Sequence, residues 1–84
     1  MTLSNSPATR YVLVEEQIDT PELGPRRSFG IAALRPTGHG YEEIAHVRDV
    51  STDQAFAAGL TERCNHAQLS SIHLQDFIAD VLES

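Results

Sequence analysis

The chain has 84 residues, of which 40% are apolar and 21% are charged, and its formal net charge is −6. These values are typical of one small soluble domain and exclude a disordered polar chain. No apolar run reaches the roughly 18 residues needed to cross a membrane, and the first residues do not resemble a signal peptide. The single cysteine, Cys64, can form no internal disulfide, so we expect a cytoplasmic protein.

The basic residues are all arginines. From Ser51 onward the sequence has one arginine, Arg63, and five acidic residues. The missing lysine excludes the phosphate-binding lysine of a P-loop and any lysine Schiff base. An acidic chain without clustered cations is repelled by DNA and by anionic lipid. We therefore expect no nucleic-acid partner and no membrane partner.

The first half of the chain predicts strands. Residues 1–8 are small and polar and predict a flexible tail, followed by one domain over residues 9–84. Gly30, inside the second predicted strand, permits a bulge or a close backbone approach. The predicted strands, rich in β-branched and aromatic residues and separated by Pro and Gly, cover residues 10–18, 28–35 and 41–50.

After Val50 the apolar spacing becomes helical. Ser51 and Gln54 match a capping box, and the helix that they open is expected to end near Asn65. The predicted buried stripe of this helix is Phe56, Gly59, Leu60, Cys64 and Ala67. Ser70 is the predicted cap of a second helix, whose apolar stripe is Leu74, Phe77, Ile78, Val81 and Leu82.

The order β-β-β-α-α with short loops predicts an α+β fold: a three-stranded antiparallel meander with both helices packed on one face. In the first strand, Tyr11 and Leu13 lie on one face, whereas Val12, Val14 and Ile18 lie on the other. Only one set can face the helices, and a second copy is the simplest cover for the other. We therefore expect a homodimer through the open sheet face or a sheet edge. The expected interaction residues are Tyr11, Leu13, Phe29 and Ile31.

The candidate chemical sites are sparse. Cys64, His66 and His73 are the nearest approach to a metal cluster, but their spacing matches no zinc pattern. A buried thiol with surface histidines explains them more simply, and solvated strand ends explain the doublets Glu15-Glu16 and Glu42-Glu43. We therefore expect no metal, no cofactor and no catalytic set.

The leading hypothesis is a non-enzymatic interaction module that self-associates and binds another protein. Two alternatives stay open. One is a small-ligand or metal-binding domain that uses His46, Cys64, His66 and His73, and the other is thiol chemistry at Cys64.

The chain also resembles a family of short uncharacterised bacterial proteins found in Gram-positive anaerobes. The resemblance covers residues 9–83 and implies no activity. It singles out Gly30, Cys64 and His73 as the first positions to test. The shared features are Tyr11-Val12-Leu13, Phe29-Gly30-Ile31, Val50-Ser51-Thr52-Asp53, Cys64 and Ile72-His73-Leu74-Gln75-Asp76-Phe77.

Overall fold

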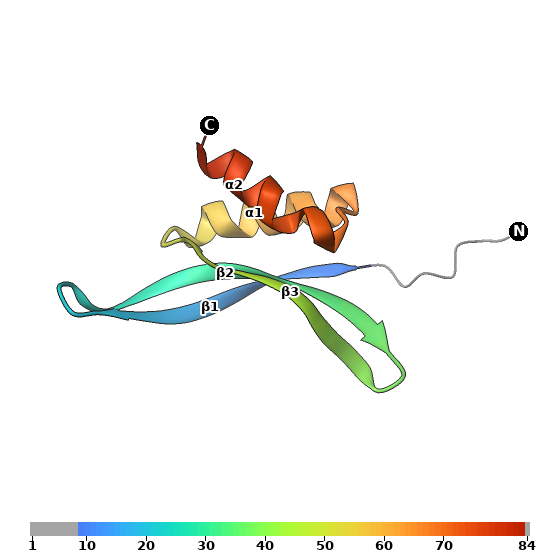
Figure 1. Ribbon diagram of the computed structural model, residues 1–84, viewed down its shortest axis with the longest axis horizontal. Coiled ribbons are helices and arrows are strands. Elements are labelled where there is room, and N and C mark those ends of the chain that lie inside the picture. The colour runs from blue at the N-terminus through green and yellow to red at the C-terminus, as the bar shows by residue number, and fades with distance from the viewer. Residues whose placement is uncertain (1–8, 84) are drawn as a thin grey trace, which may run out of the picture.

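A computed structural model describes residues 9–83, so the predicted tail lies outside the described residues. One three-stranded antiparallel sheet is followed by two helices, which confirms the predicted α+β fold (Figure 1). The elements are β1 (Arg10–Thr20), β2 (Gly24–Thr37), β3 (Gly40–Ser51), α1 (Gln54–Ala67), the 3-10 turn η1 (Ser71–His73) and α2 (Leu74–Glu83).

The sheet has the order β1-β2-β3, and both helices cover the same face (Figure 1). The first two strands run further than the sequence predicts, because residues 21–23 alone make the turn between them. Gly24 follows that turn with a φ of 72°, a conformation that glycine adopts without a steric penalty. The opposite face carries no covering layer from the described part of the chain.

The two edges of the sheet differ. β1 pairs with β2 in one unbroken register over its 11 residues, from Arg10 opposite Leu34 to Thr20 opposite Gly24. The pairing of β2 with β3 shifts register twice, and Asp49 in β3 has a φ of 53°. Such irregularities bend a strand and increase its twist, so β3 is the irregular edge and β1 the regular one.

The start of α1 differs from the sequence prediction. Asp53, and not Ser51, is the N-cap: its carboxylate accepts hydrogen bonds from the N–H groups of Ala55 and Phe56. Ser51 still belongs to β3, and its hydroxyl accepts the N–H of Asp53. The helix also continues past Asn65 and ends at Ala67, where Gln68 adopts a left-handed conformation with a φ of 52°.

The core lies between the sheet and the two helices. The buried face of α1 is turned by about one residue from the predicted stripe, so Ala57 and Thr61 are buried while Phe56 is 41% exposed. Ser70 takes the predicted N-cap position, here of η1, which leads into α2, but its side chain makes no capping hydrogen bond. The buried cluster comprises Tyr11, Ile31, Ala33, Val50, Leu60, Cys64, Leu74 and Ile78.

Candidate functional site

The helices cover the face of the sheet that carries Tyr11. Tyr11, Phe29 and Ile31 are at most 4% exposed, and the Tyr11 hydroxyl donates a hydrogen bond to the carbonyl oxygen of Leu69. Leu13, on the same face by strand alternation, is half-buried. Of the expected interaction residues, Tyr11, Phe29 and Ile31 therefore pack against the helices of their own chain, whereas the expected role of Leu13 stays a prediction.

The side chains at the alternate positions of the strands lie on the open face. One part of it is an apolar strip, which we define as Val12 and Val14 of β1, Leu34 and Pro36 of β2, and Tyr41 of β3. The register brings them together, because Pro36 lies opposite Tyr41 and Leu34 lies opposite Arg10, beside Val12. Tyr41 is 57% exposed, and the other four are half-buried.

The second part of the open face is a polar network centred on Glu16. The Glu16 side chain is only 6% exposed, and its Oε2 lies 2.8 Å from Nε2 of His46 on β3. Its Oε1 accepts the backbone N–H of Asp49 at 2.8 Å. The carboxylate thus crosses the central strand and holds β3 at its irregular segment. A buried carboxylate requires partners of this kind to offset its desolvation.

Gly30 on the central strand makes this crossing possible. A Cβ at Gly30 would lie 2.8 Å from Oε2 of Glu16 and 2.6 Å from the carbonyl oxygen of Val47. Both distances are too short for a real side chain. The close approach that the sequence allows at Gly30 is therefore realised, and what approaches is the Glu16 carboxylate together with the β3 backbone.

Further charged groups surround Glu16. Arg26 lies 3.5 Å from Asp49, whose carboxylate also accepts the Ser28 hydroxyl. Arg48 lies 3.9 Å from Glu16, and Glu43 lies 3.7 Å from Nδ1 of His46. Together with His46, three carboxylates and two guanidinium groups therefore make up this polar network. The open face is apolar at one end and densely paired in charge at the other.

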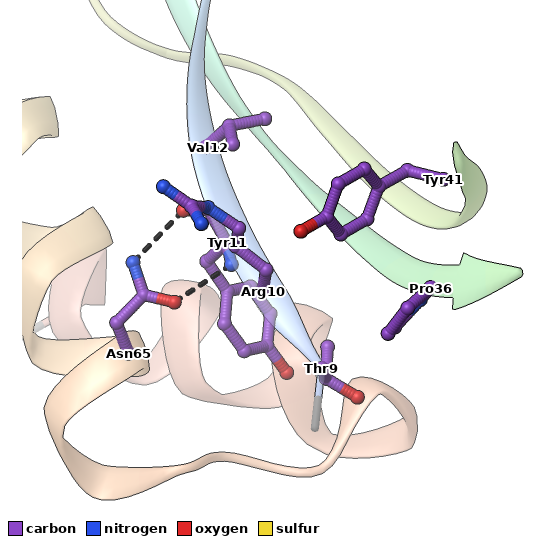
Figure 2. Close-up of a pocket in the computed structure, with 7 residues that line it drawn as sticks. All are labelled: Thr9, Arg10, Tyr11, Val12, Pro36, Tyr41 and Asn65. Carbon is purple, nitrogen blue, oxygen red and sulfur yellow. Dashed lines mark hydrogen bonds between the residues drawn. The ribbon is translucent and has the colours of Figure 1, made fainter. Parts of the chain in front are cut away.

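A hollow of about 500 Å³ adjoins the apolar strip where β1 begins. In Figure 2, Tyr41 and Pro36 lie on one side of β1, Asn65 lies on the other, and the Tyr41 hydroxyl points toward β1. Arg10 also lines the hollow, and its guanidinium makes no ion pair with any of residues 9–83. This end of the strip therefore combines apolar walls with a guanidinium group that the described part of the chain leaves without an ion pair.

Asn65 occupies the outer edge of β1 at the same hollow. Its side-chain amide accepts the Tyr11 N–H at 2.7 Å and donates to the Tyr11 carbonyl oxygen at 2.8 Å (Figure 2). The side-chain amide of Asn65 therefore makes the two backbone hydrogen bonds that a neighbouring strand would make at Tyr11. Of the residues in and beside the hollow, Asn65 is thus the one that covers the backbone of the β1 edge.

The structure does not bring together the histidines and the cysteine considered from the sequence. His46 lies on the open face, Cys64 is 1% exposed in the core on the other side of the sheet, and His66 and His73 are exposed. Burial raises the pKa of the Cys64 thiol, although nearby Arg63 acts in the opposite sense. Within residues 9–83, no three metal-binding side chains of His, Cys, Asp or Glu gather into a group.

Two residues of this region escape the sequence interpretation. Glu16 belongs to a doublet interpreted as a solvated strand end, yet it bonds His46, which is 30 positions away. Asn65 is interpreted as a helix end, yet it bonds Tyr11 across 54 positions. Two features of the sequence could have indicated the role of Glu16. It lies on the same strand face as Val12 and Val14, and the adjacent strand contains Gly30.

Comparison with known proteins adds no relative: the chain matches no family model, no curated protein and no solved structure. Neither α1 nor α2 is long and apolar enough to span a membrane.

Proposed function

We propose that this chain is a small non-enzymatic interaction module that self-associates through the open face of its sheet. The observation that carries the proposal is the apolar strip, which neither helix covers. The domain is also extended: its radius of gyration is 14.4 Å, against about 12 Å for a compact chain of this length. Both hairpin ends project past the helices (Figure 1), so the core is small and a second sheet would enlarge it.

A second copy suits this face because its two ends are complementary in charge. Arg10, at one end, has no ion-pair partner among residues 9–83, and the network around Glu16 at the other end holds more carboxylates than guanidinium groups. A two-fold axis through the strip would place Val12 and Val14 of one copy on those of the next. It would also bring each Arg10 toward the other copy's acidic end, and isologous contacts of this kind close into dimers.

Other exposed apolar side chains do not compete well with the strip. Leu23 lies in the turn between β1 and β2, Phe56 in α1, Ile72 in η1 and Leu82 in α2, and such scattered residues are normal on a monomer surface. We further propose that the module acts in the cytoplasm, where a lone thiol such as Cys64 stays reduced.

Sedimentation velocity across the micromolar range tests the proposal. We expect the wild-type chain to sediment as a dimer, and Val14→Glu to sediment as a monomer of 9.2 kDa per chain, because a buried carboxylate without a partner opposes association. Ile72→Glu is the matched control: it places the same charge on a residue that is 79% exposed on the helix side, and it should remain dimeric.

Either of two results would overturn the proposal. One is a wild-type chain that stays monomeric at every concentration. The other is a dimer that Ile72→Glu disrupts as strongly as Val14→Glu, since this would locate the contact on the helices.

A further inference from the structure

We propose that the outer edge of β1, from Leu13 to Asp19, binds an extended segment of another protein that alternates apolar with basic residues, adding a fourth strand to the sheet. This inference names the protein partner that belongs to the proposed interaction function. It uses the edge of the sheet, whereas self-association uses the open face. The two surfaces can therefore be tested separately.

The contacts of Asn65 show which backbone groups point outward. In an antiparallel ladder, alternate residues direct their N–H and C=O groups toward and away from the neighbouring strand. Tyr11 bonds Asn65 with both groups, so Tyr11 points away from β2. Its equivalents at Leu13, Glu15 and Gln17 then also point away, and none of residues 9–83 pairs with their backbone groups. They form a ladder without a partner.

The two edges of the sheet are not equally suited to strand addition. Natural sheets protect their edges with bulges, prolines, charges or a covering element. β3 is interrupted twice by register shifts, whereas β1 runs regularly and contains no proline. Asn65 covers β1 only at Tyr11. The remaining protection of β1 is acidic charge, which repels some partners and attracts others.

That charge identifies the partner. Glu15 is 61% exposed, and its only ion pair within residues 9–83, to Arg27, is 3.5 Å long and also exposed. Gln17 and Asp19 follow on the same face of β1 and are exposed. Basic side chains on an added strand would lie beside Glu15 and Asp19, and cross-strand pairs of opposite charge are favourable. On the other face, apolar side chains would extend the surface of Val14 and Ile18.

The same charge argues against a second copy at this edge. Two β1 strands side by side would bring the segment Glu15-Glu16-Gln17-Ile18-Asp19 against itself, and like charges opposite one another destabilise a sheet. An alternating basic segment is therefore the better occupant. Binding of this type draws affinity from main-chain hydrogen bonds and specificity from alternate side chains.

The test uses a synthetic peptide of about nine residues, within the usual range of strand lengths, that alternates valine and arginine. We expect it to bind the full chain, with backbone amide shifts concentrated at residues 13–19. A peptide with glutamate in place of arginine should not bind. A third peptide, with proline in place of valine, keeps the positive charge but cannot form a ladder. It should bind at least about tenfold more weakly.

Two variants locate the site. Gln17→Pro removes one outward N–H without touching the β1–β2 ladder and should weaken binding by about tenfold, whereas Gln17→Thr keeps the N–H and should bind normally. Glu15→Arg provides a second measure that does not depend on the proline, with Glu83→Arg as its control of equal charge. We expect Glu15→Arg to bind several-fold more weakly and Glu83→Arg to bind nearly as the wild type does.

The inference is overturned if no peptide binds, if the proline-containing peptide binds as well as the valine peptide, or if Gln17→Pro and Glu15→Arg both bind normally. Sedimentation of the same variants separates the two proposals. Gln17→Pro should still dimerise, and Tyr41→Glu, which alters the apolar strip on β3 away from the peptide-binding edge of β1, should bind the peptide as a monomer. A dimer that binds no peptide contradicts this inference alone.

Discussion

The carboxylate of Glu16 occupies the space that a side chain at Gly30 would fill. Its Oε2 would lie 2.8 Å from a Cβ at Gly30, and the same oxygen lies 2.8 Å from Nε2 of His46. A glycine in the central strand therefore lets an edge strand bond directly to the opposite edge. Gly30 weakens the local strand propensity, and the Glu16 contacts with His46 and Asp49 offset that loss.

Substituting this glycine should be costly. We expect Gly30→Ala to lower the free energy of unfolding by about 1–3 kcal/mol, because the new Cβ meets both the Glu16 carboxylate and the Val47 carbonyl oxygen. Gly38→Ala is the matched control, since a Cβ there meets nothing within 4 Å. Urea denaturation followed by circular dichroism measures both variants. Equal stability of the two would show that Glu16 moves aside without cost.

Loss of the Asn65 side chain should expose the edge at Tyr11. Asn65→Ala removes two hydrogen bonds to the Tyr11 backbone, and we expect a loss of about 1–2 kcal/mol in unfolding free energy. His66→Ala, at the next and exposed position of α1, should change stability little. Amide hydrogen exchange gives the local measurement: the Tyr11 N–H should exchange faster in Asn65→Ala. An unchanged rate would contradict the role assigned to this amide.

The fold should lose stability at alkaline pH. Burial, with a contribution from Cys64, raises the pKa of the Tyr11 hydroxyl, and burial raises the pKa of the Cys64 thiol. Both groups then hold their protons in the folded state at pH values where the unfolded chain releases them. The stabilisation is complete below the ordinary pKa values. It is lost as the pH rises toward the raised ones, by at most about 1.4 kcal/mol per pH unit for each group.

Unfolding free energies measured from about pH 8 to about pH 11 test this expectation. Cys64→Ala and Tyr11→Phe should each flatten part of the decline, although both variants start from a lower stability. Iodoacetamide should label Cys64 slowly until the chain unfolds, because the buried thiol stays protonated. Rapid labelling near neutral pH would contradict the burial of this residue and revive the hypothesis of thiol chemistry.

The helix cap offers a direct comparison of sequence with structure. Asp53→Ala removes the acceptor for two N–H groups of α1 and should cost about 1 kcal/mol of unfolding free energy. Thr52→Ala, at an exposed position beside it, should cost little. Thermal unfolding of both variants measures the difference. A larger effect at Ser51 than at Asp53 would restore the capping box that the sequence suggests.

Local periodicity was enough to predict the order and type of the elements. In α2 the apolar spacing leaves only one face that can be buried, and Leu74 and Ile78 are indeed inside the core. In α1 the spacing is weaker, so the predicted buried face is turned by about one residue from the true one, although Leu60 and Cys64 belong to both. The strands were predicted too short because residues typical of turns, such as Pro25 and Pro36, can also occupy the ends of a strand.

The sequence alone determined a three-stranded meander with two helices and an apolar surface on both sides of β1. Only the tertiary structure decided that the helices cover Tyr11 and leave Val12 and Val14 open, and that Glu16 and Asn65 have distant partners. The physical reason is that a strand with apolar residues on both faces gives no local preference for burying one face over the other. That choice depends on contacts between segments far apart in the chain, such as the hydrogen bond from Tyr11 to Leu69.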